Sequence, residues 1–164
     1  MVPSAAELTA RVLDRGTLDE VLDLSLKPGQ EAHVAHNAVS VAQAAYEPFC
    51  WIRGLFAGNR AVGLISMIDL DPVHPDASPD DPEDAAYLWR FMIAAEHQGR
   101  GLGTAAMGLA FAQARRWGRA QLCVDVSEGP GNPGPFYRRF GLAPTEWVND
   151  GERMFLGPVP PMHL

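Results

Sequence analysis

The stretch Gln98-Gly99-Arg100-Gly101-Leu102-Gly103-Thr104 connects an apolar run that ends at Ile93 to a segment with helical periodicity. Glycine at every second position lets the backbone turn tightly and approach a ligand without interference from a Cβ atom. The N–H groups of this loop and of the first helical turn carry partial positive charge and point toward one spot. Arg100 adds a guanidinium that can contact an anion directly. The stretch therefore predicts a strand-to-helix turn that binds a pyrophosphate.

The glycine spacing distinguishes this turn from two common nucleotide-binding loops. A dinucleotide-binding fingerprint has G-x-G-x-x-G after the first strand of a domain and an acidic residue about 20 positions later. Here the spacing is G-x-G-x-G, the turn lies late in the chain, and no such acid ends the next strand. A P-loop requires Gly-Lys-Ser/Thr after its glycines, and this sequence has none there.

Strands and helices are expected to alternate around this turn, without an internal repeat. Capping-box spacings at Thr17 and Ser40 predict the starts of two helices, and Lys27-Pro28-Gly29 is expected to end the first. A hairpin is expected around Gly58-Asn59-Arg60. The remaining expectations are strands at Leu8–Leu13, Trp51–Ala57, Ala61–Leu70, Ala86–Ile93 and Gln121–Val126, helices at Thr104–Trp117 and Gly134–Phe140, and a second hairpin around Asn149-Asp150-Gly151.

The order glutamine-glycine-arginine-glycine-leucine-glycine after a strand resembles motif A of the GNAT acetyltransferase superfamily. A second block, Asn132 to Leu142, looks like the family's later motif, with Leu142 in place of the usual final phenylalanine. The two blocks are separated as in the family, and the resemblance covers Leu8 to Leu156. It implies an α/β (α+β) GNAT fold: a mixed, mostly antiparallel sheet with a splayed strand pair and helices on both faces. We expect a single domain over residues 1–156 and a loose, proline-rich tail over 157–164.

The resemblance also implies a site for acetyl-CoA as cosubstrate. The backbone of the strand before the loop would bind the pantetheine arm, which here means Phe91, Met92 and Ile93. A strand bulge near Ile93 would supply an N–H group for the oxyanion. Asn132 and Phe136 match positions that contact the cofactor, and Tyr137 matches a tyrosine that protonates the departing sulfur. The pyrophosphate cradle would consist of Gln98, Gly99, Arg100, Gly101, Leu102, Gly103 and Thr104.

The residues around Tyr137 support this role independently. Phe136 and Phe140 are four positions apart on a helix, so they share a face that we expect to point into the core. Tyr137 lies about 100° around the helix from Phe136, which can leave its hydroxyl at the edge of a cleft. A phenol with a pKa of about 10 can give a proton or a hydrogen bond to a leaving thiolate. The structural alternative is a core tyrosine whose hydroxyl bonds to a backbone carbonyl.

Composition limits the partners. The formal net charge is −7, which disfavours a nucleic-acid partner and favours cations. Every charged residue from Asp69 to Asp84 is acidic, in a proline-rich loop that is either simply solvated or a cation-attracting rim. No apolar run has the length of a membrane span, and residues 1–13 do not resemble a signal peptide, so we expect a cytoplasmic protein. Cys50 and Cys123 are expected to be reduced. His33 and His36 have helix-face spacing but no acidic or cysteine partner, so a structural role is expected for them and no metal is predicted.

The acceptor is inferred from finer resemblances. The segments Trp89–Ile93 and Pro133–Arg139 resemble the bacterial spermine and spermidine acetyltransferase branch, whereas Met154–Gly157 departs from it. This predicts a small-molecule amine acceptor, with a polyamine favoured. Glu47 and Asp69 are candidate ammonium anchors or plain surface carboxylates. The alternatives are another amine, such as an antibiotic or a protein N-terminus, and a non-catalytic module that only binds acetyl-CoA. A homodimer is also left open, because dimerisation is common in the family.

Overall fold

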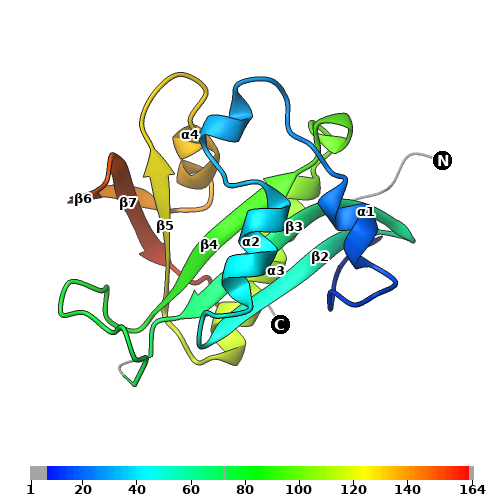
Figure 1. Ribbon diagram of the computed structural model, residues 1–164. Coiled ribbons are helices and arrows are strands. Elements are labelled where there is room, and N and C mark those ends of the chain that lie inside the picture. The colour runs from blue at the N-terminus through cyan, green and yellow to red at the C-terminus, as the bar shows by residue number, and fades with distance from the viewer. Residues whose placement is uncertain (1–6, 72, 163–164) are drawn as a thin grey trace.

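A seven-stranded sheet organises the computed structural model, which describes residues 7–71 and 73–162 (Figure 1). The strand order is β1-β2-β3-β4-β5-β7-β6, and all neighbouring strands are antiparallel except the parallel pair β4–β5. This confirms the predicted mixed, mostly antiparallel α/β fold. The strands are β1 (Leu8–Arg11), β2 (Cys50–Ala57), β3 (Arg60–Asp69), β4 (Ala85–Ile93), β5 (Gln121–Ser127), β6 (Ala143–Asn149) and β7 (Glu152–Pro158).

Helices cover both faces of the sheet, as predicted. On one face lie α1 (Leu18–Leu22) and α2 (Asn37–Ala44), and on the other lies α3 (Leu102–Arg116) (Figure 1). The short α4 (Gly134–Arg138) and the 3₁₀ turns η2 (Gln30–Ala32) and η3 (Ala95–His97) complete the set. None of the helices in the described ranges combines the length and the apolar character of a membrane span.

Two hydrophobic cores result from this layering. The larger, on the α3 side, packs Ala106, Met107 and Phe111 of α3 against the sheet, and we call it the α3-side core. The smaller joins Val21 of α1 to Met92 of β4 and neighbouring strand residues. Residues 61–68 of β3 are buried at every position because the strand is covered on both faces. A continuous apolar run is the pattern expected for such a central strand.

Several predicted boundaries are wrong. The first helix ends at Leu22 instead of continuing to Lys27. The second begins at Asn37, and its N-cap is His36, whose Nδ1 accepts a hydrogen bond from the N–H of Ala38. Ser40, the expected cap, is buried inside that helix.

The C-terminal segment is more ordered than its proline content predicts. Gly157 and Pro158 belong to β7, and Pro158 pairs with Gln121 of β5. A Cβ atom at Gly157 would lie 2.3 Å from the carbonyl oxygen of Gly141, so the two backbones approach closely. The expected loose tail therefore does not begin at Gly157, and residues 163–164 lie outside the described residues.

The decisive feature for function is the short pairing of β4 with β5. Only Ala85–Tyr87 of β4 pair with β5, opposite Gln121–Cys123. β4 then continues to Ile93 along β3 while β5 continues along β7. The two strands therefore separate in the middle of the sheet, which confirms the predicted splayed pair.

The close contact between β3 and β4 gives a test of the packing. A Cβ atom at Gly63 would lie 2.3 Å from the carbonyl oxygen of Met92. We expect Gly63→Ala to lower the free energy of unfolding by about 1–3 kcal/mol, measured by urea denaturation. The control is Gly108→Ala in α3, where no heavy atom lies within 4 Å of the added Cβ and alanine favours the helix. Equal stabilities of the two variants would contradict this packing.

Candidate active site

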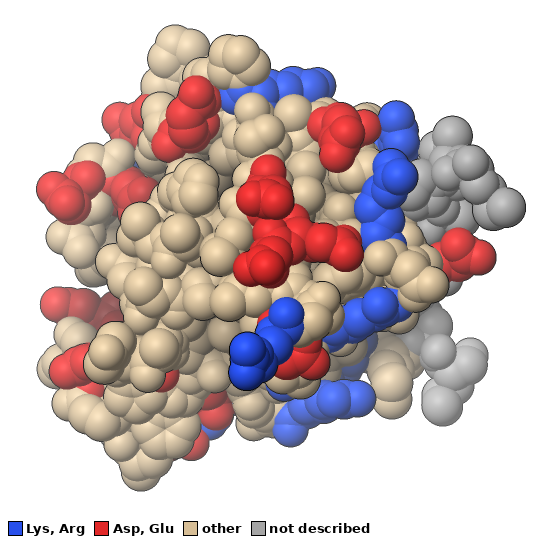
Figure 2. Space-filling model, turned by 45° about the vertical axis from the view of Figure 1, so that its right-hand side comes forward, with Lys and Arg blue, Asp and Glu red and all other residues tan. Residues whose placement is uncertain are grey.

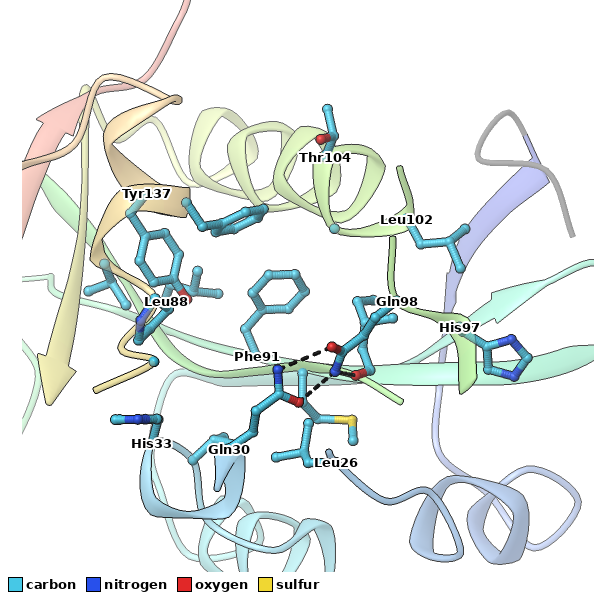
Figure 3. A pocket seen from close by; sticks show the side chains of 18 of the residues that line it. Leu26, Gln30, His33, Leu88, Phe91, His97, Gln98, Leu102, Thr104 and Tyr137 are labelled. Atoms are coloured by element: carbon cyan, nitrogen blue, oxygen red, sulfur yellow. Dashed lines mark hydrogen bonds between the residues drawn. The ribbon is translucent and has the colours of Figure 1, made fainter. Parts of the chain in front are cut away.

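A cavity of about 520 Å³ lies where β4 leaves β5 (Figure 3). It is bounded by β4 and β5, by the N-terminal end of α3, by α4 and by the segment 26–34. Eleven predicted site residues line it: Phe91, Met92, Ile93, Gln98, Gly99, Gly101, Leu102, Gly103, Thr104, Phe136 and Tyr137. Arg100, Asn132, Glu47 and Asp69 are not among the lining residues.

Unpaired backbone amides gather at one end of this cavity. Gly99 and Gly101 have φ angles of 74° and 77°, a conformation that other residues seldom adopt, and Gly101 is the N-cap of α3. None of the N–H groups from Gly99 to Thr104 donates to a backbone carbonyl of the described residues. A 15-residue helix adds its positive dipole end at this point. The donors present fit an anionic pyrophosphate.

Gln98 braces this end of the cavity through its side chain. Its Nε2 donates to the carbonyl oxygen of Ile93 (2.9 Å) and to Oε1 of Gln30 (2.7 Å), and Gln30 returns a bond of 3.1 Å (Figure 3). No local pattern pointed to Gln30, which lies 68 positions away. Gln98 therefore fixes the strand end and the η2 segment to each other, in addition to its place in the loop.

The free edge of β4 presents alternate residues to the opening. Ala94 donates its N–H to Val62 of β3, and the carbonyl of Ile93 instead meets Gln98. Backbone groups alternate in direction along an antiparallel strand. The backbone N–H and C=O groups of Phe91 and Ile93 therefore face the opening, and those of Met92 face β3. Two of the three residues predicted to offer their backbone to pantetheine are therefore available, and Met92 lines the cavity without a free backbone edge.

Aromatic side chains form one wall of the cavity. Phe136 of α4 lies 6.0 Å from Phe91, 5.2 Å from Tyr137 and 5.0 Å from Phe140, measured between ring centroids. A Cβ atom at Gly103 would lie 3.2 Å from the Phe136 ring. This glycine lets the first turn of α3 approach α4 closely.

Tyr137 is more deeply buried than Phe136, which reverses the expected order. Its exposed fraction is 5%, and its ring packs in the α3-side core. Burial raises the pKa of the Tyr137 phenol. Tyr137 lines the cavity together with Leu88 of β4, and Thr104 lies apart from it at the start of α3 (Figure 3). The alternative role, a hydroxyl bonded to a backbone carbonyl, is not found among the described residues, where burial is the sole cause of the pKa shift of Tyr137.

The side chain of Asn132 does not line the cavity but bonds to the backbone of its own loop. Its Oδ1 accepts from the N–H of Gly134 at the start of α4, and its Nδ2 donates to the carbonyl of Gly129. Both distances are 2.9 Å. Asn132 thus fixes the loop that leads into α4 and positions the helix that carries Phe136 and Tyr137.

The two candidate ammonium anchors are occupied elsewhere. Asp69 contacts Arg119 through both carboxylate oxygens, at 2.6 and 3.3 Å, and Arg119 also contacts Asp71 at 2.7 Å. Glu47 Oε1 lies 2.8 Å from Nε2 of His74. The positions of these carboxylates do not support a role as ammonium anchors, because neither lines the cavity. Asp69 is paired with Arg119, and Glu47 contacts His74.

The bulge in β4 lies further from the loop than expected. The register with β3 shifts where Ser66 faces Arg90 and Met67 faces Leu88, which leaves Trp89 as the extra residue. The predicted bulge near Ile93 is therefore wrong. The extra residue falls close to the point where β4 and β5 separate, beyond Tyr87.

Leu88, Asp125 and His33 are among the cavity residues that the sequence reasoning missed. Leu88 and Asp125 lie at the narrow end, on β4 and β5. His33, read as structural, lines the cavity and contacts Ser127 Oγ and the carbonyl of Pro130 through its two ring nitrogens. The position of Asp125 two residues after the last β4–β5 pair is a signal only once the pairing is known.

The sequence matches the acetyltransferase (GNAT) family over residues 18–142. The chain belongs to this family. Membership confirms the predicted enzyme class, an acetyl-CoA-dependent N-acetyltransferase, and acetyl-CoA as its cosubstrate. Among curated protein sequences, no significant match to this GNAT chain is found.

Solved structures share the fold at low sequence identity. An acetyltransferase from Thermus thermophilus is 19% identical, covering 92% of this chain and 96% of the other, with a TM-score of 0.70. PaiA N-acetyltransferase from Thermoplasma acidophilum, in complex with coenzyme A, is 14% identical over 92% and 98%, with a TM-score of 0.64. Spermidine/spermine N-acetyltransferase SpeG from Vibrio cholerae, in complex with manganese ions, is 16% identical over 94% of each chain, with a TM-score of 0.61.

The cradle of this GNAT protein can be tested at Gly103. We expect Gly103→Val to raise the dissociation constant of coenzyme A at least tenfold, about 1.4 kcal/mol, measured by calorimetry. The added side chain would meet Phe136 and disturb the first turn of α3. Gly108→Val is the matched control on the exposed part of the same helix. An unchanged dissociation constant in a folded Gly103→Val protein would contradict the cradle.

Proposed function

We propose that the protein transfers the acetyl group of acetyl-CoA to a primary amine of a small molecule, by direct attack in a ternary complex. One observation carries this proposal: a single cavity has unpaired amides at one end and a buried phenol at the other. Acetyl-CoA supplies an activated acetyl group as a thioester. The residues of the chain hold the two ends of this substrate and handle the protons.

The loop residues 99–104 would bind the pyrophosphate through their N–H groups, because the helix dipole and the glycine conformations favour an anion there. Phe91 and Ile93 would offer backbone groups to the amides of the pantetheine arm. The Phe91 and Phe136 rings would exclude water from the arm. These assignments use the unpaired polar groups that the opening of the sheet creates.

Tyr137 is proposed as the proton donor to the leaving sulfur. Its raised pKa keeps the phenol protonated at neutral pH, so it can donate a proton and does not act as a base. The packing of its ring against Phe136 holds the hydroxyl in one direction. A fixed donor costs less reorganisation during the reaction than water would.

A polycation such as spermidine is the narrower acceptor that we propose. The net charge of −7 and the likeness to a spermidine/spermine acetyltransferase fold support it. The acidity is not uniform, since Figure 2 shows Asp and Glu gathered near the middle of one face with Lys and Arg beside them. The attraction of a cation would therefore come from the summed field of the protein and not from the Asp69–Asp84 loop alone.

The role of Tyr137 predicts the behaviour of a single variant. Tyr137→Phe keeps the ring and its contacts but removes the donor. We expect kcat to fall roughly 100-fold while the dissociation constant of coenzyme A stays nearly unchanged. Single-turnover measurements replace kcat if product release limits the rate. Wild-type chemistry in this variant would show that the phenol is structural.

A thiol-release assay with an amine panel tests the reaction and the acceptor together. We expect kcat/KM for spermine and spermidine to exceed that for benzylamine at low salt and a pH of about 8, and to fall as salt is added, since the Debye length shortens to about 10 Å at 0.1 M. Equal kcat/KM values for all three amines would refute the proposal that the acceptor is a polyamine. Tight binding of acetyl-CoA with no thiol release for any amine would instead favour a non-catalytic module.

A further inference from the structure

Asp125 of β5 lines the cavity, and one of its carboxylate oxygens has no partner among the described residues. Oδ2 accepts a hydrogen bond of 3.0 Å from the hydroxyl of Tyr87 on β4. Oδ1 is buried and makes no hydrogen bond within the described part of the chain. A buried carboxylate oxygen without a donor is unfavourable, so a ligand that brings an N–H or O–H group would be stabilised there.

The strand register places Asp125 at the narrow end of the opening. Tyr87 pairs with Cys123, the last pair before the strands separate. Two residues further along each strand, Asp125 stands across the gap from Trp89, the extra residue of the bulge. Asp125 and Tyr137 both line the cavity.

The two side chains come from opposite faces of the sheet. Val124 and Val126 belong to the α3-side core, as does Tyr137. Because side chains alternate along a strand, Asp125 points to the face that carries α2. Its bond to Tyr87 agrees, and so does the neighbouring Arg90, which reaches Gln43 of α2 at 3.1 Å. A proton acceptor thus lies on one side of the gap and a proton donor on the other.

We propose that Asp125 binds the amino group of the acceptor through Oδ1 and takes the proton that this group loses. The proposal rests on acetyl transfer to an amine as the function of the site. A carboxylate oxygen without a donor favours an acceptor whose reacting nitrogen carries an N–H group, as a primary amine does. Tyr87 is a positioning residue that holds the carboxylate through Oδ2.

The protons balance in this arrangement. The amine nitrogen bonds to the acetyl carbon, and the bond from that carbon to sulfur breaks. One proton of the amine passes to the Asp125 carboxylate, and the Tyr137 hydroxyl gives its proton to the sulfur. Solvent afterwards removes the proton from Asp125 and restores the one on Tyr137, so the products are an amide and a free thiol.

The surroundings of Asp125 agree with a carboxylate that must hold and release a proton. Burial raises the pKa of the Asp125 carboxyl, and the hydrogen bond from Tyr87 lowers it in part. The ionised form accepts the proton, so activity should be lost as the pH falls through this raised pKa. The charged or titratable groups around it are Tyr87 and Arg90 of β4, Cys123 of β5, Glu152 of β7, and His33 and Arg139 of the cavity lining.

Asp125→Asn tests the assignment with little change in shape. With spermidine and benzylamine as probes, we expect kcat/KM to fall at least 100-fold for each amine that the wild type acetylates. The dissociation constant of coenzyme A should stay within about twofold, since the carboxylate serves the acceptor side. Asp80→Asn is the control, because it removes the same charge from an exposed loop outside the cavity and should leave kcat/KM within about twofold.

The pH profile separates a catalytic carboxylate from a structural one. Tyr87→Phe removes a bond that lowers the pKa of Asp125, so the acid limb of kcat/KM should move to higher pH. Asp125→Asn should lose that limb. If the acid limb of kcat/KM stays at the same pH in Tyr87→Phe as in the wild type, Asp125 does not cause the pH dependence. That result would overturn the proposal.

Remaining outcomes are also decisive. Asp125→Asn with wild-type kcat/KM overturns the assignment and leaves acetyl transfer intact. An equal loss of coenzyme A binding and of activity would make Asp125 a structural residue of the cavity. If the wild type acetylates neither probe, calorimetry of spermidine with the coenzyme A complex decides: binding that Asp125→Asn abolishes supports the anchor. If the wild-type complex does not bind spermidine, or if Asp125→Asn binds it equally well, the role of Asp125 as an anchor is refuted. This result is independent of whether the acetylation reaction is observed.

Discussion

The separation of β4 from β5 is the constraint on which the site depends. The strands share three residue pairs and then expose two edges in the middle of a covered sheet. Backbone N–H and C=O groups at such edges are costly unless something binds them. Gln98 satisfies one carbonyl, that of Ile93, and leaves Phe91 available. An extended ligand with its own amides is the natural complement to an edge of this kind.

Neighbouring elements keep the two strands apart. The bulge at Trp89 lies where they diverge, and bulges increase the local twist of a strand. On the other side, α4 places Phe136 and Tyr137 beside the gap, where their rings pack with Phe91 and the α3-side core. Aromatic packing thus forms one wall of the opening, and polar side chains such as Gln30, His33 and Arg139 line other parts of it.

The sequence predicted the parts of this structure that depend on local pattern. The glycine loop, the hairpin of β2 and β3 and helix α3 follow from conformational preference and periodicity within short windows. The missed side-chain contacts join distant positions: Gln30 with Gln98 across 68 residues, Arg119 with Asp69 across 50, and Tyr87 with Asp125 across 38. Side-chain partners of this kind depend on strand order and register, which a single sequence does not display.

The pairing of Arg119 with Asp69 and Asp71 changes what the net charge can do. These carboxylates form ion pairs of 2.6 and 2.7 Å, so the acidic loop offers fewer free charges than its composition indicates. The charge of −7 then acts mainly at a distance, where it raises the local concentration of cations and is screened by salt. Recognition at contact distance needs a desolvated group inside the cavity, since an exposed carboxylate binds an ammonium only weakly. Asp125 is half-buried between the splayed strands and meets that requirement at Oδ1, which is buried and has no partner among the described residues. Long-range attraction and short-range selection are therefore carried by different carboxylates, and the sheet geometry determines which one selects.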